Sequence, residues 1–319
     1  MNNFAGNKVA IIVPCYNEAL SIQKVIADFR QALPEASIFI FDNNSTDNTV
    51  QIAKSEGVQV FNVMQKGKGN VVRRMFADVD ADIYVMVDGD ATYDASCCPA
   101  LIDKLISEHL DMVVGARVHM IKEAYRPGHS WGNKILTGCV KLIFGGEFSD
   151  MLSGYRVFSK RYVKSFPALA TGFETETELT VHALELRMPY AEIDTPYSPR
   201  MESSVSKLST YKDGAKILKT IIKLYSVERP FFFYGILAII FALIGICISI
   251  PIIDEYIITG LVPRLPTAVL STGLLIFSAI AFITGLILEC ITMGRREFKR
   301  LFYLSLPLPH GNQGTNEHV

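Results

Sequence analysis

One stretch of the sequence joins a buried strand to a pair of acids and decides the fold: Ile83-Tyr84-Val85-Met86-Val87-Asp88-Gly89-Asp90. Such an apolar run is typical of a strand buried on both faces of a parallel sheet. Side chains two residues apart on an extended chain point the same way, so both carboxylates can face one metal ion. Carboxylate oxygens suit Mg²⁺ or Mn²⁺ and, through the metal, a diphosphate. The alternative is an ordinary Asp-Gly-Asp turn, which the preceding buried strand makes less favoured.

Apolar strand patterns alternate with helical patterns on both sides of this stretch. We predict further strands at residues 9–13, 37–41, 58–63, 111–114 and 188–195, and helices at 18–32, 46–55, 70–78, 100–109, 131–144 and 175–186. This alternation predicts an α/β fold whose parallel sheet binds ligands beyond the carboxyl ends of its strands. Pro14, Asp42 and Asp88 each follow such a strand, so the sequence places a ligand site at that edge.

The loops after the first two strands carry polar side chains of two kinds. Tyr16 offers a face on which a base can stack, and Glu18 can accept from ribose hydroxyls; Asn17 is equally well explained as a helix N-cap. The run Asp42 to Asp47 is rich in ordinary capping residues, and Asp42 is the member that we expect to be functional. Lys66-Gly67-Lys68-Gly69-Asn70 is a basic glycine turn before a helix, where a phosphate can sit on backbone N–H groups. It lacks the spacing of a P-loop.

Composition excludes several classes of function. The formal net charge of the 319 residues is -1, which gives no global basic field to attract nucleic acid. Six cysteines contain no CxxC pair, so neither a zinc site nor a disulfide framework is expected. Hydrophobic residues make up 50% of the chain, more than an ordinary soluble protein has. The first residues lack the apolar core and cleavage site of a signal peptide.

Two uncharged apolar runs near the carboxyl end, residues 231–253 and 267–288, are each long enough to span a bilayer. Basic residues flank both runs, whereas the connecting loop has only Arg264 as a base. The positive-inside rule therefore predicts that the first domain and both termini are cytoplasmic. We expect a domain at residues 1–210, an interfacial helix at 211–229, a two-helix membrane domain at 230–293 and a cytoplasmic tail at 294–319.

Four lysines lie at helical spacing before the first span, at Lys212, Lys216, Lys219 and Lys223. Apolar residues occupy the rest of this helix, as expected for a helix that lies on an anionic leaflet. The alternative is a solvated lysine face on a helix packed against the first domain. The adjacent span favours the interfacial interpretation.

Several short motifs, taken together and in order, resemble glycosyltransferase family 2. They are Pro14-Cys15-Tyr16-Asn17-Glu18, Asp42-Asn43-Asn44-Ser45-Thr46-Asp47, Gly67-Lys68-Gly69 and Asp88-Gly89-Asp90. Later motifs are similar to the polyprenyl-phosphate branch of that family: Ser153-Gly154-Tyr155-Arg156, Gly172-Phe173-Glu174-Thr175-Glu176 and Ser206-Lys207-Leu208. The resemblance covers nearly the whole chain, including the two spans.

The resemblance implies a GT-A (Rossmann-like, mostly parallel sheet) catalytic domain and a role for each matching residue. The nucleotide-sugar would be bound by Pro14, Tyr16, Glu18, Asp42, Lys68 and Asp88, and the metal, Mg²⁺ or Mn²⁺, by Asp88 and Asp90. The acceptor phosphate would be bound by Arg117, Asn133, Ser153, Arg156, Arg200 and Lys207. The catalytic set would be Asp90, Arg117, Arg200 and Glu176; surface charge remains the alternative for the arginines, and a helix first turn for Glu176.

The resemblance implies an inverting transferase in the bacterial inner membrane, a homo-oligomer, specifically a tetramer. It would move a sugar from a nucleotide-sugar, UDP-glucose or UDP-N-acetylglucosamine, to a polyprenyl phosphate. Two positions depart from the family pattern: Thr92 stands where many members have Gln, and Asn43 where the second motif usually has Asp. The alternatives are a processive polysaccharide synthase, whose Gln-x-x-Arg-Trp motif is absent, and a non-catalytic membrane scaffold.

Overall fold

The computed structural model describes residue 4 and residues 6–119, 137–138, 140–146, 148–172, 174–199 and 210–311. The chain divides into two compact units. The sheet unit comprises Met1–Lys219 and Lys299–Val319, and the helical unit comprises Thr220–Phe298. The helix expected at residues 131–144 lies mostly outside the described residues.

The sheet unit is built on seven strands in the order β3-β2-β1-β4-β6-β5-β7. Their bounds are β1 (Val9–Cys15), β2 (Ser37–Asp42), β3 (Gln59–Asn62), β4 (Ile83–Met86), β5 (Met112–His119), β6 (Arg156–Ser159) and β7 (Tyr190–Tyr197). All neighbouring pairs are parallel except those of β6, which runs antiparallel to both β4 and β5. The expected mostly parallel α/β sheet is confirmed.

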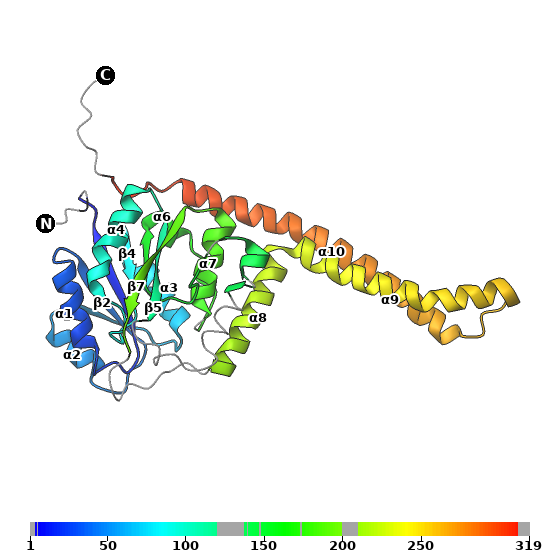
Figure 1. Ribbon diagram of the computed structural model, residues 1–319, viewed down its shortest axis with the longest axis horizontal. Coiled ribbons are helices and arrows are strands. Elements are labelled where there is room, and N and C mark those ends of the chain that lie inside the picture. The colour runs from blue at the N-terminus through cyan, green and yellow to red at the C-terminus, as the bar shows by residue number, and fades with distance from the viewer. Residues whose placement is uncertain are drawn as a thin grey trace, which may run out of the picture. The chain divides into compact units, whose positions relative to one another are not determined.

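Helices connect these strands and lie on both faces of the sheet (Figure 1). They are α1 (Ile22–Ala32), α2 (Thr49–Ser55), α3 (Lys68–Asp78), the short η1 (Ala95–Cys97), α4 (Cys98–Ser107), α6 (Lys160–Ser165) and α7 (Thr175–Leu186). Two starts were predicted too early: the helices expected from residues 18 and 46 begin at Ile22 and Thr49. Polar side chains in both preceding loops bond across to each other and hold several residues out of the helices.

Alternation along β1 and β4 divides the core into two layers. Ile11, Val13 and Val85 belong to a cluster that includes apolar residues of α1, α2 and α4. On the other face, Phe76 of α3 packs edge-on against Tyr84 and Phe158. Both faces are therefore covered, which explains why β4 is wholly apolar.

The last helix of the chain, α10 (Leu265–Leu304), ends in the sheet unit, to which its residues from Lys299 onward belong. Tyr303 donates a hydrogen bond of 2.6 Å to the fully buried Asp111, which also accepts from Ser159 and Arg161. Lys299 forms an ion pair of 2.9 Å with Glu185 of α7. The expected tail at residues 294–319 is thus, from Lys299 to residue 311, packed as part of the sheet unit.

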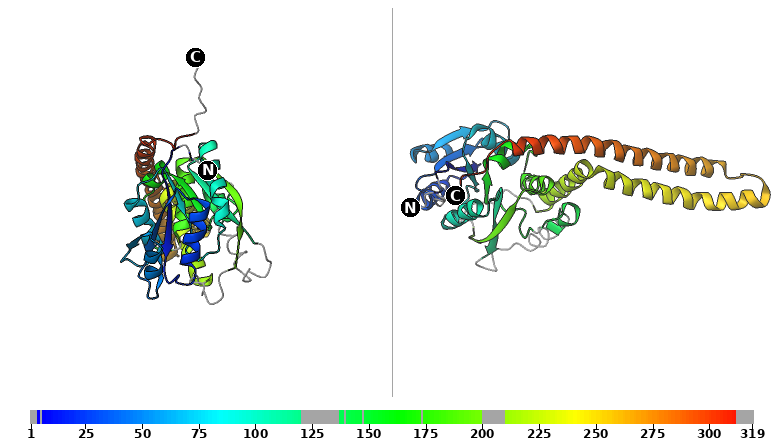
Figure 2. Two further views of the ribbon diagram at one scale, coloured as in Figure 1. Left: turned by 90° about the vertical axis from the view of Figure 1, so that its left-hand side faces the viewer. Right: turned by 90° about the horizontal axis from the view of Figure 1, so that it is seen from above.

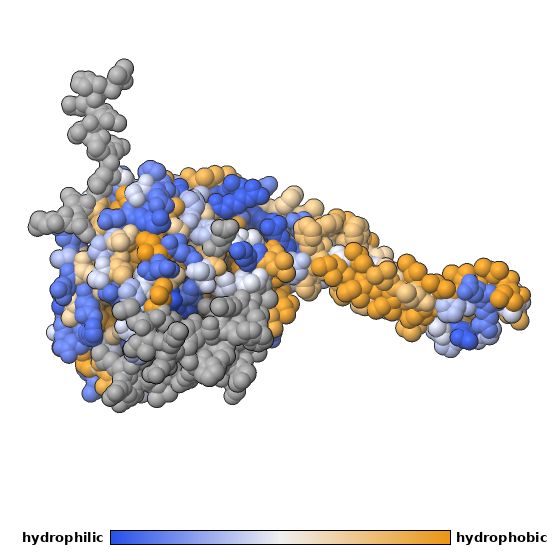
Figure 3. Space-filling view, in the orientation of Figure 1, coloured by the Kyte–Doolittle hydropathy of each residue, from blue (hydrophilic) through white to orange (hydrophobic). Residues whose placement is uncertain are grey.

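The helical unit contains all of α9 (Pro230–Thr259), most of α10 (Leu265–Leu304) and the end of α8 (Thr210–Glu228). By length and composition α9 and α10 could each cross a membrane. Figure 2 shows the two running side by side, and hydroxyls join them: Ser271 donates to the carbonyl of Gly245, and Ser278 to that of Ala238. Figure 3 shows mostly apolar surface along these two helices, with a hydrophilic patch near the turn that joins them. Such helices pack through small residues and hydroxyls when lipid surrounds them.

Candidate active site

The carboxyl ends of β1 and β2 carry two loops that are tied together by side chains. Asn17 has a left-handed backbone (φ 53°), and its carboxamide oxygen accepts from the Thr46 N–H at 2.7 Å. In return the Asn17 N–H donates to Ser45 Oγ at 2.8 Å. The N-cap of α1 is Ser21, so the interpretation of Asn17 as a cap is wrong. Ser21 instead bonds the carbonyl of Gly89 at 2.7 Å, which fixes the acidic loop after β4 to the first loop.

Asp42 ends β2 with an unsatisfied carboxylate oxygen. Its side chain is buried, 3% exposed, and Oδ2 accepts the Ser45 N–H at 3.1 Å. Oδ1 is buried and has no hydrogen-bond partner among the described residues. A buried carboxylate oxygen without a partner is costly, so this atom is suited to accept a hydrogen bond from a ligand.

Asn43 is the first departure from the family pattern, and its carboxamide has a structural role. Its Nδ2 donates to the carbonyls of Val63 and Gln65, and its Oδ1 accepts the Gly67 N–H at 2.7 Å. A carboxylate could not donate the first two bonds. The amide therefore fixes the glycine turn beside Asp42.

Asp88, Lys68 and Glu176 form a charged cluster that is mostly shielded from solvent. The Lys68 ammonium lies 2.5 Å from Asp88 Oδ1 and 2.6 Å from Glu176 Oε1. Burial would lower the pKa of Lys68, but the two carboxylates outweigh burial and raise that pKa well above its ordinary value. The structure therefore brings together three residues expected at the site, one from α3, one from the loop after β4 and one from α7.

Asp90 is held by the residue at the second departure from the family pattern. Thr92 donates to Asp90 Oδ1 through its hydroxyl at 2.6 Å and its N–H at 3.3 Å. The Thr92 carbonyl accepts the Ser198 N–H at 2.9 Å. Thr92 thus orients the buried carboxylate and joins the acidic loop to the segment after β7.

Gly154 lies against the carboxylate of Asp88. A Cβ at residue 154 would lie 2.4 Å from Asp88 Oδ2, so any other residue there would displace this carboxylate. The Gly154 N–H donates to the Tyr93 hydroxyl at 2.9 Å, which holds this backbone against the acidic loop. Sequence reasoning gave Gly154 no role of its own, although its place in the Ser-Gly-Tyr-Arg motif was a signal for it.

Asp88 and Asp90 provide hard oxygen donors that fit Mg²⁺ or Mn²⁺. Among the described residues no group of three or more His, Cys, Asp or Glu side chains could hold a metal ion. An ion at this carboxylate pair needs further oxygen ligands, and a diphosphate is a group that supplies them. Gly154, by leaving the Oδ2 side of Asp88 free of a side chain, is consistent with such an occupant.

The glycine turn serves backbone packing more than phosphate binding. A Cβ at Gly67 would lie 2.1 Å from the Thr171 carbonyl oxygen, and one at Gly69 would lie 2.3 Å from that of Ala170. The Gly69 N–H already donates to Thr171 O. Because this N–H is used, the prediction that backbone N–H groups of the turn bind a phosphate is wrong at Gly69. What the turn presents to the site is the Lys68 side chain.

Arg117 lies at the end of β5 in a network that orients it. Its guanidinium donates to both carboxylate oxygens of Asp150, at 2.6 and 2.7 Å, and lies over the ring of Tyr197 at 5.6 Å. Burial would lower the Arg117 pKa, but Tyr93 and Asp150 raise it, so the group stays cationic. This position agrees with an arginine near a phosphate, while a contact with phosphate remains a prediction.

Arg156 and Ser153, expected at the acceptor phosphate, are interior residues whose polar groups are bonded within the protein. Arg156 is 0% exposed, and its guanidinium donates to the carbonyls of Ser153 and Met151 and to Thr180 Oγ1. The Ser153 hydroxyl donates to the Gly115 carbonyl at 2.6 Å. These bonds hold the loop before β6, and a contact of either residue with the acceptor phosphate remains a prediction.

The remaining expected residues fall into two groups. The half-buried Pro14 lies within β1 near its carboxyl end, and Tyr16, 38% exposed, and the half-buried Glu18 lie in the loop that follows. Asn133, Arg200 and Lys207 lie outside the described residues.

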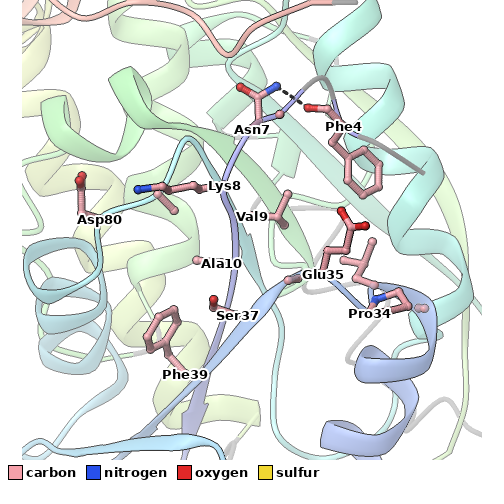
Figure 4. Close-up of a pocket in the computed structure, with 15 residues that line it drawn as sticks. Phe4, Asn7, Lys8, Val9, Ala10, Pro34, Glu35, Ser37, Phe39 and Asp80 are labelled. Carbon is pink, nitrogen blue, oxygen red and sulfur yellow. Dashed lines mark hydrogen bonds between the residues drawn. The ribbon is translucent and has the colours of Figure 1, made fainter. Parts of the chain in front are cut away.

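A cavity of about 530 Å³ lies at the opposite edge of the sheet (Figure 4). Its lining includes Lys8 and Val9 at the start of β1 and Ser37 at the start of β2. These are the amino ends of the strands, whereas Asp42 and the acidic loop lie beyond the carboxyl ends. The cavity is therefore separate from the candidate active site.

A mostly parallel sheet with acidic side chains at the carboxyl ends of β2 and β4 defines a nucleotide-binding domain of the GT-A type. The family model described as glycosyl transferase family 2 matches residues 10–166. An uncharacterized protein of Shigella flexneri is 61% identical over 155 residues, which are 49% of this chain and 95% of that protein. The chain belongs to glycosyl transferase family 2, as the sequence motifs indicated.

More distant relatives cover more of the chain. Glycosyltransferase AglJ of Haloferax volcanii is 29% identical over 92% of this chain and 97% of its own. Dolichyl-phosphate hexose transferase of the same organism is 26% identical over 72% of this chain and 99% of its own. Among solved structures, glucosyl-3-phosphoglycerate synthase of Mycobacterium tuberculosis, crystallised with Mn²⁺, UDP-glucose and phosphoglyceric acid, has a TM-score of 0.59 at 20% identity, covering 70% of this chain and 81% of that one.

Proposed function

We propose that this glycosyltransferase moves a hexose from a nucleoside diphosphate sugar to a polyprenyl phosphate at a membrane surface. The observation that carries the proposal is the convergence of Asp42, Asp88 and Asp90 at one edge of the sheet, with Asp42 Oδ1 unsatisfied. Asp42, Tyr16 and Glu18 would bind the nucleoside, and Asp88 and Asp90 the diphosphate through Mg²⁺ or Mn²⁺. UDP-glucose or UDP-N-acetylglucosamine is the proposed donor, in agreement with the UDP-glucose complex of the structural neighbour.

The lipid acceptor is supported by three observations. Two apolar helices, α9 and α10, follow the sheet unit. Dolichyl-phosphate hexose transferase aligns along 99% of its length, so the resemblance extends beyond the nucleotide-binding motifs. The basic residues of α8 and of the flanks of α9 and α10 suit an anionic cytoplasmic leaflet. We place the sheet unit and both termini on that side of a bacterial inner membrane, with a homo-oligomer, a tetramer, as the assembled form.

The chemistry asks little of a general base. A phosphate monoester is already largely ionised at neutral pH, so the acceptor oxygen can attack the anomeric carbon directly. A bound divalent ion would supply stabilisation of the departing diphosphate. Lys68 and Arg117 add positive charge on the protein side, with Arg200 and Lys207 proposed beside them. A single displacement inverts the anomeric centre, which gives a β-linked product from an α-linked donor.

Glu176 is better suited to holding Lys68 than to removing a proton, because its Oε1 is paired with the ammonium at 2.6 Å. The processive-synthase alternative is disfavoured by the missing Gln-x-x-Arg-Trp motif, since the single tryptophan is Trp131. A scaffold without activity would have no use for an unsatisfied Asp42 oxygen beside two oriented acids.

The test is direct. Purified protein is incubated with polyprenyl phosphate, Mn²⁺ and a panel of nucleotide-sugars, and the lipid product is identified by mass. We expect one polyprenyl-phosphate hexose, formed by the wild type and lost in Asp90→Ala with the fold intact. A product longer than one sugar would favour the synthase, and no glycolipid from any donor would overturn the proposal.

A further inference from the structure

The ammonium of Lys68 is paired with a carboxylate oxygen of Asp88 that a divalent ion would also use as a ligand. This ammonium contacts Asp88 Oδ1 directly, and Asp88 and Asp90 are the two acids proposed to hold the ion. We propose that Lys68 is a tethered cation that occupies Asp88 until a diphosphate arrives, so that divalent ion and nucleoside diphosphate bind as a pair. This inference rests on the proposed function and specifies how its donor site is controlled.

The backbone of Lys68 cannot carry such a change, so the side chain must. The next residue, Gly69, donates its N–H to Thr171 O, and the glycines on both sides lie against carbonyls of residues 170 and 171. Arg73, one turn further along α3, donates two hydrogen bonds to the carbonyl of Ala168. A lysine stem with four rotatable carbons nevertheless lets its ammonium move between partners while its Cα stays fixed.

Glu176 gives the ammonium a place to remain when it leaves Asp88. Glu176 is buried, Oε1 holds Lys68, and Oε2 is buried with no hydrogen-bond partner among the described residues. An ammonium has three donors, and two are accounted for by the two carboxylates. On release from Asp88, Lys68 would keep Glu176 and donate to a phosphate oxygen, while Asp88 Oδ1 becomes available to the ion.

Two further acids, one in α7 and one at its N-cap, support the loop that precedes this helix. Glu178 accepts the N–H groups of Leu169 and Ala170, both at 2.8 Å, and Glu174 accepts that of Gly172 at 3.0 Å. These bonds fix the loop against which the glycine turn packs. Helix α7 therefore supplies both the support of the turn and the second carboxylate for its lysine.

Reciprocal linkage gives the proposal a measurable form. If the diphosphate removes a competitor of the ion, each must raise the affinity of the other by the same factor. Without nucleotide, we expect Lys68→Met to bind Mn²⁺ at least tenfold more tightly than the wild type, because the competing ammonium is gone. With UDP present, the wild type should gain at least that factor, and Lys68→Met should gain less.

Binding is measured on the full chain in detergent by the electron paramagnetic resonance signal of free Mn²⁺, which does not depend on turnover. Lys66→Met is the matched control, because it removes an exposed lysine of the same turn. Its Mn²⁺ affinity should equal that of the wild type. Lys68→Arg keeps the cation and should keep the weak binding.

A second pair of variants guards against misfolding of Lys68→Met, whose two carboxylates lose their counter-charge. The double variant Lys68→Met/Glu176→Gln should bind Mn²⁺ more tightly than Glu176→Gln alone. Equal affinities in each comparison would overturn the role of Lys68 and leave the proposed transferase standing. No Mn²⁺ binding by any form, with or without UDP, would overturn the metal site itself and this inference with it.

Discussion

The Cα of Gly154 faces the carboxylate of Asp88 so closely that a Cβ there would lie 2.4 Å from Asp88 Oδ2. Gly154 lies just before β6, the antiparallel strand that pairs with both β4 and β5. The insertion of this strand into an otherwise parallel sheet therefore brings a glycine against the acidic loop. The position of the carboxylate depends on that missing side chain.

We expect Gly154→Ala to lower transferase activity by about 100-fold or more, because the methyl group displaces Asp88 from Lys68 and from any bound ion. Overpacking costs of about 1–3 kcal/mol are typical, so the protein should still fold. Initial rates and thermal unfolding check this. Gly294→Ala is the control, since a Cβ there meets nothing within 4 Å. Unchanged activity in Gly154→Ala would contradict the arrangement.

Asp42→Asn should separate binding from stability. The carboxamide oxygen of the variant can still accept the bond from the Ser45 N–H. Its NH₂ group then replaces the unpaired Oδ1 and presents a donor where the ligand needs an acceptor. Loss of a charged hydrogen bond to the donor is worth about 1.5–3 kcal/mol, so the donor KM should rise by about 10–100-fold. The Tm should stay equal or rise, because a buried unsatisfied carboxylate is removed. A lower Tm with an unchanged KM would make Asp42 structural.

Arg156 and Arg117 should respond differently to replacement by lysine. Arg156→Lys loses the fork that bonds two backbone carbonyls in the interior, so it should lower the unfolding free energy by at least about 2 kcal/mol. Arg117→Lys keeps a charge beside Asp150, so its Tm should fall less, and its acceptor KM should rise about tenfold. The two are compared by thermal unfolding and by kinetics with polyprenyl phosphate. A raised acceptor KM with normal Tm in Arg156→Lys would support its expected role at the acceptor.

Because His182 is buried, we expect the protein to lose stability in acid. His182 is fully buried in α7, and burial and, to a lesser extent, Lys299 lower its pKa from 6.5 to about 3. Below pH 6.5 the His182 imidazole is protonated in the unfolded chain but stays neutral in the native state. The unfolding free energy therefore falls as the pH falls. At pH 5 the loss is about 2 kcal/mol. It continues until the pH reaches the lowered pKa.

The measurement is the Tm difference between pH 7 and pH 5. His182→Gln, which can still meet Ser165 Oγ, should show a smaller difference than the wild type. His310→Gln, which removes an exposed imidazole, should match the wild type. Equal differences in all three proteins would show that His182 does not titrate on unfolding.

Local pattern predicted six of the seven strands of the sheet and the acidic loop, but it missed β6, the strand that runs antiparallel to its neighbours. Apolar runs such as Ile83 to Val87 report burial on both faces directly, because every residue of such a strand must be apolar. Two helix starts were predicted too early. The helices begin at Ile22 and Thr49 because side chains of the two preceding loops bond to each other. Those partners are distant in sequence.

The sequence by itself determined the mostly parallel α/β sheet, the family and the two long apolar helices, since each rests on short-range periodicity or on a motif. Only the tertiary structure decided which charges meet. The strand order places Arg156 in the interior between β4 and β5, and helix α7 brings Glu176 to Lys68 and Asp88. A charged residue in a sequence gives its charge and its place along the chain. Its partner and its burial follow from the packing of strands and helices that the chain connects over long distances.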